Sequence, residues 1–359
     1  MDRLIRKRAF IIALAALALT ASTRAVAQAP MFADTDENRE RVARAYQDYQ
    51  RINREHGHYI EVNGIRMHYL EWGSESGVPL IWAHGYSSTA FELVSVAQEL
   101  VEAGYHVYAV SYRGHGKTQV DDYNFSLSHI ADDIASMMHQ LNIEKAVVGG
   151  LSLGGGVATA FYDHYPDRVL ALVLEDGGAD NVQVRTERLF PVLKAYGEPM
   201  PDFSKLIFEE RFALFQTLAG LYMPGWGGSI PPGIAPAFHS WIVERKDGRF
   251  APHLDHPKLL GTGPATIDPA RSGETTLLMQ SWRRTHPIIT YRNLGVPMLI
   301  IDPTGDAFDA SEDFAALGAL HPTFVNVVEY PDTPHTAHPM RPEWFIRDMK
   351  NLLDRIESR

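Results

Sequence analysis

The stretch that most constrains the fold of this chain is rich in glycine and contains one serine. Residues 149–156 read GGLSLGGG, after an apolar run at 146–148 and before a helix-like segment at 157–162. A serine between two glycines where a strand turns into a helix has the pattern G-x-S-x-G, in which a strained turn lifts the hydroxyl out of the sheet. Gly150, Gly154 and Gly156 fit the demand for positions without side chains. The pattern predicts that Ser152 is a nucleophile.

Short apolar runs and helix-like stretches alternate through most of the chain. The hairpin signal Asn63-Gly64 lies between the alternating segments 58–62 and 65–70 and predicts an antiparallel pair. The later apolar runs lie at 79–83, 107–110, 146–148, 169–174, 298–301 and 324–328. Continuous apolar strands separated by helices predict an α/β fold with a mostly parallel sheet covered by helices on both faces.

The segment 179–285 interrupts this alternation. It has many prolines, glycines and aromatic residues, and it predicts a helical cap inserted into a core formed by 58–178 and 286–359. Most of its aromatic side chains are expected to form the core of the cap, and a minority to face a pocket. This composition favours an apolar or aromatic substrate. Residues 30–57 form a charged leader, interpreted as an exposed helix with no chemical role.

The first 29 residues have the layout of a secretory signal peptide. Basic residues at 3–8 precede an apolar run at 9–19, and small residues follow at 25, 27 and 29. Cleavage after Ala27 or Ala29 is expected, by either the general or the twin-arginine export route. The apolar run is shorter than the roughly 20 residues that span a bilayer, so no stable membrane anchor is expected after cleavage. The protein is therefore predicted to be periplasmic or secreted.

Charge and composition exclude several functions. The net charge is −11, which disfavours nucleic acid as a partner, and the absence of cysteine rules out disulfides and thiolate metal sites. Neither the group His253, Asp255 and His256 nor the acids that follow the apolar run 298–301 have a known metal-ligand spacing. The glycines match no nucleotide-binding pattern. We expect neither a metal nor a cofactor.

Over nearly all of residues 59–356 the chain resembles the α/β-hydrolase superfamily. The resemblance depends on His84-Gly85, on the sequence YRGHG at 112–116, on the serine turn, on an acidic turn after 298–301 and on a late histidine. It implies a catalytic serine, acid and histidine in that chain order. Serine at the turn argues against the haloalkane dehalogenase and epoxide hydrolase branches, which have aspartate there.

A serine hydroxyl needs a base, and the base needs a carboxylate that orients it. Of the 16 histidines, His335 is the expected base, because it lies in the loop between the last strand and a closing helix that starts at Pro342; His338 is the alternative. The resemblance implies Asp306 as the acid. Asp309 and Asp176 remain alternatives, the latter because some relatives place the acid after the preceding strand.

The resemblance also implies an oxyanion hole made by two backbone N–H groups, those of Leu153 and Tyr86. His84, Arg113 and His115 are interpreted as residues that organise the surrounding turns.

These residues together predict an exported serine hydrolase that cleaves a carboxylic ester or lactone, a small-molecule partner, through an acyl-enzyme. Amide or peptide cleavage, hydrolysis of a carbon–carbon bond and perhydrolysis would use the same triad. A receptor-like protein that binds its ligand with little turnover is the alternative outside catalysis.

Overall fold

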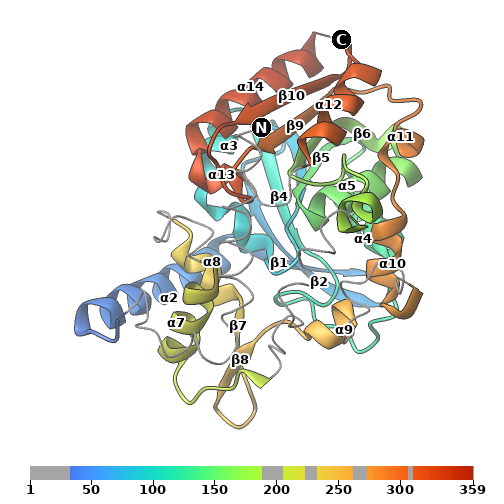
Figure 1. Cartoon of the computed structure of the whole chain (residues 1–359). Helices are drawn as coiled ribbons and strands as arrows, with labels where there is room; N and C mark the ends of the chain where they lie inside the picture. Colours follow the sequence, from blue (N-terminus) through green and yellow to red (C-terminus); the bar gives the residue numbers. More distant parts are fainter. Residues whose placement is uncertain (1–32, 188–204, 223–232, 262–272, 306–309, 359) are drawn as a thin grey trace, which may run out of the picture.

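The computed structural model describes residues 33–187, 205–222, 233–261, 273–305 and 310–358. Its centre is an eight-stranded sheet with the order β1-β2-β4-β3-β5-β6-β9-β10 (Figure 1). The strands are β1 (Gly57–Val62), β2 (Ile65–Trp72), β3 (Val78–Ala83), β4 (Tyr105–Ser111), β5 (Ala146–Leu151), β6 (Val169–Glu175), β9 (Met298–Pro303) and β10 (Val325–Tyr330). β2 pairs antiparallel with β1 and β4, and all other neighbours are parallel. The predicted α/β fold and opening hairpin are confirmed.

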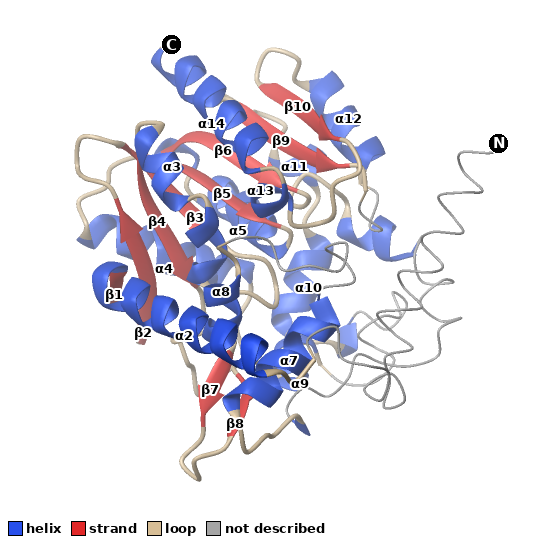
Figure 2. Cartoon of the chain, turned by 90° about the vertical axis from the view of Figure 1, so that its left-hand side faces the viewer, coloured by secondary structure: helices blue, strands red, loops and turns tan. Residues whose placement is uncertain are grey.

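Helices cover both faces of this sheet (Figure 2). They are α3 (Ala97–Glu102), α4 (Leu127–Gln140), α5 (Leu153–His164), α12 (Ser311–Leu320), α13 (Ala337–Met340) and α14 (Pro342–Glu357), with 3₁₀ turns η2 (Ala90–Ser95) and η3 (Pro166–Arg168). Successive residues of a strand point to opposite faces. Ile81 accordingly joins the core beneath α4, α5 and α12, whereas Trp82 joins the core beneath α3 and α14. The two cores explain why the central strands are apolar along their whole length.

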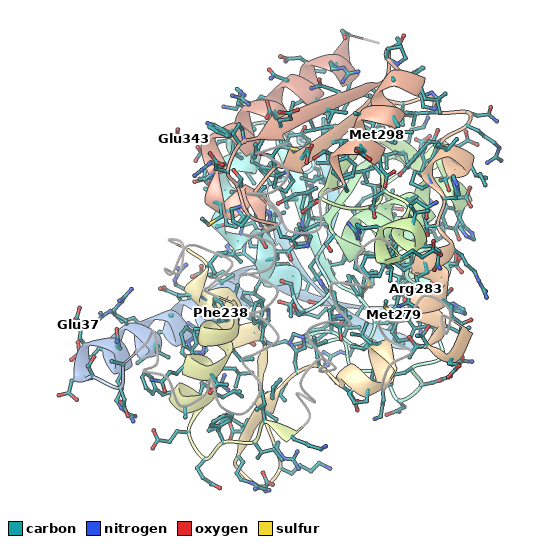
Figure 3. The ribbon with its side chains drawn as sticks, viewed as in Figure 1. Glu37, Phe238, Met279, Arg283, Met298 and Glu343 are labelled. Carbon is teal, nitrogen blue, oxygen red and sulfur yellow. The ribbon has the colours of Figure 1, made fainter. Side chains whose placement is uncertain are left out.

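A smaller layer lies between β6 and β9 in the sequence, where the cap insertion is predicted. It contains α7 (Arg211–Tyr222), α8 (Ala235–Ser240), β7 (Ile242–Glu244), β8 (Phe250–Pro252), α9 (His256–Leu260) and α10 (Leu277–Arg284). The next helix, α11 (Pro287–Thr290), lies beyond the predicted cap and contacts α5. Figure 3 labels Phe238 on α8 at one side of this layer and Met279 on α10 at the other. The antiparallel pair β7-β8 differs from the all-helical expectation. Its turn contains Asp247-Gly248 with φ of 81° at the glycine, a hairpin signal in an otherwise helix-like segment.

The charged leader contains helix α2 (Asp36–His56), and one side of it is buried. Val42, Ala45 and Ile52 are the buried residues. His239 of α8 donates from Nε2 to the Val42 carbonyl at 2.9 Å, and the Arg211 guanidinium lies over the Tyr46 ring. The helix therefore packs against α7 and α8 rather than standing free (Figure 1). Among the described residues, no helix combines the length and the apolar character needed to cross a membrane.

Candidate active site

Ser152 lies at the junction of β5 and α5 in a strained backbone conformation. Its φ of 55° and ψ of −115° are unusual for a residue with a side chain. Its amide donates to the carbonyl of Glu175 at 2.8 Å, which ties the turn to the end of the neighbouring strand β6. The residue is 9% exposed. The serine is thus held at the carboxyl ends of the parallel strands, where open α/β sheets bind their ligands.

The glycines around Ser152 are required by backbone contacts. A Cβ on Gly154 would overlap the Ala83 carbonyl of β3, and a Cβ on Gly155 would overlap the Gly177 carbonyl. Gly178 has φ of 82°, and a Cβ there would meet the Gly155 carbonyl. Helix α5 therefore approaches both β3 and the turn after β6 with no side chain between them.

His335 is hydrogen-bonded to an aspartate. Its Nδ1 lies 2.6 Å from Oδ2 of Asp176. The Asp176 side chain is 2% exposed and the His335 side chain 28% exposed. Because an ionised carboxylate only accepts hydrogen bonds, Nδ1 carries the proton and Nε2 of the neutral ring is left as a base. Asp176 follows Glu175, which binds the Ser152 amide, so the serine and the histidine are attached to the same end of β6.

The observed partner of His335 differs from the acid expected from the sequence. Asp306 and Asp309 lie outside the described residues, and Asp176, the alternative after the preceding strand, holds the imidazole. A sequence signal for this position exists. Asp176 is followed by two glycines, and such a pair after a strand indicates close backbone approach, here to the serine turn. Asp176 itself has a left-handed φ of 46°, which aspartate tolerates better than most residues.

The two predicted oxyanion donors, Leu153 and Tyr86, follow the carboxyl ends of the neighbouring parallel strands β5 and β3. Leu153 is the first residue of α5, so its N–H has no acceptor within the helix. Tyr86 follows Gly85, whose amide donates to Oε2 of Glu92 at 3.0 Å and whose carbonyl accepts from Nδ1 of His84 at 2.7 Å. The loop after β3 is thus fixed by side chains next to the expected donor.

His84, Arg113 and His115 have the surroundings of structural residues. The His84 ring stacks on Tyr112 with centroids 3.9 Å apart, and burial lowers its pKa well below the usual value, so that it is neutral. Arg113 pairs with the buried carboxylate of Asp133. His115 lies next to His84, with ring centroids 4.9 Å apart.

The alternative base, His338, is completely buried and has a different acid. Its Nδ1 lies 2.9 Å from Oε2 of Glu175, and neither side chain is exposed. Sequence reasoning did not identify Glu175 as part of the site. Among the described residues, no three histidine or acidic side chains are grouped so that they could hold a metal ion.

Comparison with known proteins identifies the family. A family model described as alpha/beta hydrolase fold matches residues 78–219. A non-heme chloroperoxidase of Burkholderia pyrrocinia is 30% identical over 204 residues, which are 55% of this chain and 71% of that protein. A bifunctional esterase/perhydrolase of Acinetobacter calcoaceticus is 28% identical over 52% of this chain and 66% of its own length. The chain belongs to the α/β-hydrolase superfamily.

Solved structures show the same fold at lower identity. An E-2-(acetamidomethylene)succinate hydrolase superposes with a TM-score of 0.62 and 21% identity, over 83% of this chain and 98% of that one. A membrane phospholipase A superposes with a TM-score of 0.62 and 19% identity, over the full length of both chains. The match to a relative from Mycobacterium phage D29 spans 48% of that protein. These comparisons support a hydrolase, with esterase and haloperoxidase relatives.

Proposed function

We propose that the protein is an exported serine hydrolase that cleaves a carboxylic ester or lactone through an acyl-enzyme. The observation that carries this proposal is the attachment of Ser152 and of the His335–Asp176 pair to the same end of β6. Together these residues make up a nucleophile, a base and an acid that orients the base. An esterase/perhydrolase among the relatives supports the same class of substrate.

In the proposed reaction, Ser152 Oγ attacks the carbonyl carbon while His335 Nε2 takes its proton. Asp176 accepts the Nδ1–H bond and stabilises the imidazolium that forms. The N–H groups of Leu153 and Tyr86 donate to the oxyanion of the tetrahedral intermediate. His335 then returns the proton to the leaving alcohol, and water attacks the acyl-enzyme by the same steps in reverse to release the acid.

The test is turnover of a substrate panel by the chain that begins at Pro30. The panel contains p-nitrophenyl esters of increasing acyl length, aromatic esters, aliphatic lactones and, because one structural neighbour is a phospholipase, a phospholipid. Ser152→Ala should lower kcat by at least about 10³-fold. Ser136→Ala on the outer side of α4 is the matched control and should leave kcat unchanged. Full activity of Ser152→Ala would exclude the mechanism.

A reactive serine without ester or lactone turnover would exclude the proposed substrate class. Labelling of Ser152 by a fluorophosphonate in that case would favour amides, carbon–carbon bonds or a receptor-like role. Faster cleavage of acetate esters than of all longer or aromatic ones would contradict the expected apolar substrate.

Perhydrolysis is a second candidate reaction, favoured by the perhydrolase and chloroperoxidase relatives. Hydrogen peroxide would replace water in attacking the acyl-enzyme, lose a proton to His335 and leave as the peroxy acid. Peracid formed from acetate and peroxide by the wild type, and not by Ser152→Ala, would support it. Its absence in an active esterase would exclude it.

The proposed export is tested by cell fractionation and by sequencing the mature N-terminus. Cleavage after Ala27 or Ala29 leaves a chain that begins at Gln28 or Pro30. Recovery of the uncleaved chain in the membrane fraction would instead indicate a retained anchor.

A further inference from the structure

Glu175 and His338 form a buried pair under the loop that carries His335. Oε1 of Glu175 accepts the backbone N–H groups of Ala337 at 2.6 Å and His338 at 3.0 Å. Oε2 of the same carboxylate lies 2.9 Å from Nδ1 of the His338 ring. Asp176, the next residue, binds the His335 ring. Two successive acids at the end of β6 therefore hold one short loop at two points.

The other nitrogen of the His338 ring also meets an acceptor. Nε2 lies 3.1 Å from the backbone carbonyl oxygen of Glu92, which can only accept. A neutral imidazole carries one N–H, so two donated bonds need a protonated ring. A proton on Glu175 would be the neutral alternative. Two backbone N–H bonds to Oε1 favour the ionised carboxylate instead.

The groups around His338 agree with a charged ring. Burial by itself lowers the pKa of His338, but the Glu175 carboxylate, and Glu92 after it, outweigh burial and raise that pKa above the usual value. These two acids, one from β6 and one from η2, are the titratable groups that face the ring. The rings of Trp82 and Phe345 also lie beside it, with centroids 5.8 Å and 5.7 Å away.

Glu92 extends this arrangement to the loop after β3. Its carboxylate accepts from the Gly85 amide at 3.0 Å and from Trp82 Nε1 at 3.2 Å. Gly85 directly precedes Tyr86, the expected oxyanion donor. A continuous set of buried hydrogen bonds thus runs from the loop of His335, through Glu175, His338 and Glu92, to the oxyanion loop.

We propose that His338 is protonated at neutral pH and that this imidazolium positions both of these loops and balances the charge of Glu175. It is a positioning residue, and its effect on catalysis depends on the proposed hydrolase function. The balance matters because Glu175 is adjacent in sequence to the acid of the His335 pair. An uncompensated carboxylate there would stabilise the protonated form of His335 and raise its pKa.

The protonation state is measured first, by long-range ¹H–¹⁵N correlation spectra of the full mature protein. His338 is assigned by the signal that is lost in His338→Gln. Both ring nitrogens should be protonated from about pH 6 to about pH 8. A ring with one protonated nitrogen, or one that titrates near the ordinary value of about 6.5, would overturn the proposal. This readout needs no substrate, so it remains decisive if the proposed hydrolase activity is not found.

The charge balance is tested by the acid limb of the pH profile of kcat/KM. This limb reports the pKa of the catalytic base, His335, in the free enzyme. His338→Gln leaves Glu175 uncompensated, so the limb should move to higher pH by about 0.5 unit or more. Glu175→Gln removes the negative charge, so the limb should move to lower pH. The double variant has no charge at either position, and its limb should return to within about 0.3 unit of the wild type.

The positioning role predicts a fall in kcat of at least about 10-fold in both single variants, with KM changed by less than about 3-fold. His139→Gln, an exposed histidine at the end of α4, is the control and should match the wild type. Shifts of the same sign in both single variants, or a double variant no closer to the wild type than either, would overturn the charge balance. Thermal unfolding of each variant identifies those that fail to fold. If a variant does not fold, the proposal is decided by the protonation state of His338 in the spectra of the wild type.

Discussion

Glu175 and Asp176 are adjacent acids whose carboxylates bind different parts of the same loop. Glu175 is the last residue of β6 and Asp176 lies just beyond it, so one acid reaches the buried backbone at 337–338 and the other the partly exposed ring of His335. The left-handed backbone of Asp176 turns the chain at this point. Two residues of the same type therefore have separate roles, determined by their place at the end of β6.

The identity of the catalytic acid is tested by replacing each of the two candidate aspartates, Asp176 and Asp306, with asparagine in separate variants. Asp176→Asn should lower kcat by about 10³-fold or more, because an amide in place of the carboxylate favours the wrong tautomer of His335. Asp306→Asn should lower kcat by less than about 10-fold. Both variants are measured with the best ester of the panel, alongside fluorophosphonate labelling. Loss of activity in Asp306→Asn with full activity in Asp176→Asn would reinstate the acid favoured by family resemblance.

The sequence indicates Ser152 and His335 by clearer local patterns than it indicates the acid. Ser152 is marked by the glycines that its turn requires, and His335 by its loop before a proline-started helix. The two glycines after Asp176 indicate a close backbone approach but do not identify the acid, since a carboxylate can reach the imidazole from the end of more than one strand. Sequence reasoning considered His338 only as an alternative base and did not identify Glu175, because their partnership joins residues 163 positions apart and leaves no pattern in the sequence.

At the scale of elements, α2 connects the smaller layer to the sheet. Its first half contacts α7 and α8 through Val42 and Tyr46. Near its end, Asn53 Oδ1 accepts from the Lys117 ammonium at 2.7 Å and from His68 Nε2 at 3.1 Å. The sequence predicted an exposed helix or leader here, and the structure has a helix with one buried side. Its charged surface concealed the few residues by which it binds at both ends.

Asn53→Ala should destabilise the protein by about 1–3 kcal/mol, because Lys117 and His68 both lose a partly buried acceptor. Urea unfolding measures the change, and limited proteolysis should show earlier cleavage within residues 36–56. Asn124→Ala, at an exposed position, is the matched control and should change stability by less than about 0.5 kcal/mol. Equal stability of the two variants would show that α2 is not held at this point.

At the scale of the whole molecule, buried histidines make stability depend on pH. Burial, followed by the Lys117 and His58 charges, lowers the pKa of His68 to about 3. Burial likewise lowers the pKa of His239 to about 3. The unfolded chain binds protons at these histidines below about pH 6.5 while the folded chain does not, so their contribution to stability is lost as the pH falls towards 3.

The free energy of unfolding should therefore fall from about pH 6.5 downwards, by up to about 1.4 kcal/mol per pH unit for each such histidine. His68→Gln and His239→Gln should flatten the profile, and the exposed control His139→Gln should not. His338 acts in the opposite sense. Its raised pKa stabilises the fold at low pH, and that contribution is lost as the pH rises through the folded value. Urea unfolding measured both below and above about pH 6.5 tests the two effects, and a flat profile would contradict them.

The contact of α5 with the turn after β6 also limits how this protein could be re-engineered. Gly155 and Gly178 meet backbone to backbone, and Gly154 meets β3 in the same way. A directed-evolution library randomised at 149–156 or 177–178 would consist mainly of chains that cannot close this contact. Diversity is better placed in the described cap segments 205–222, 233–261 and 273–285, where a changed side chain leaves these backbone contacts and the turn of Ser152 in place.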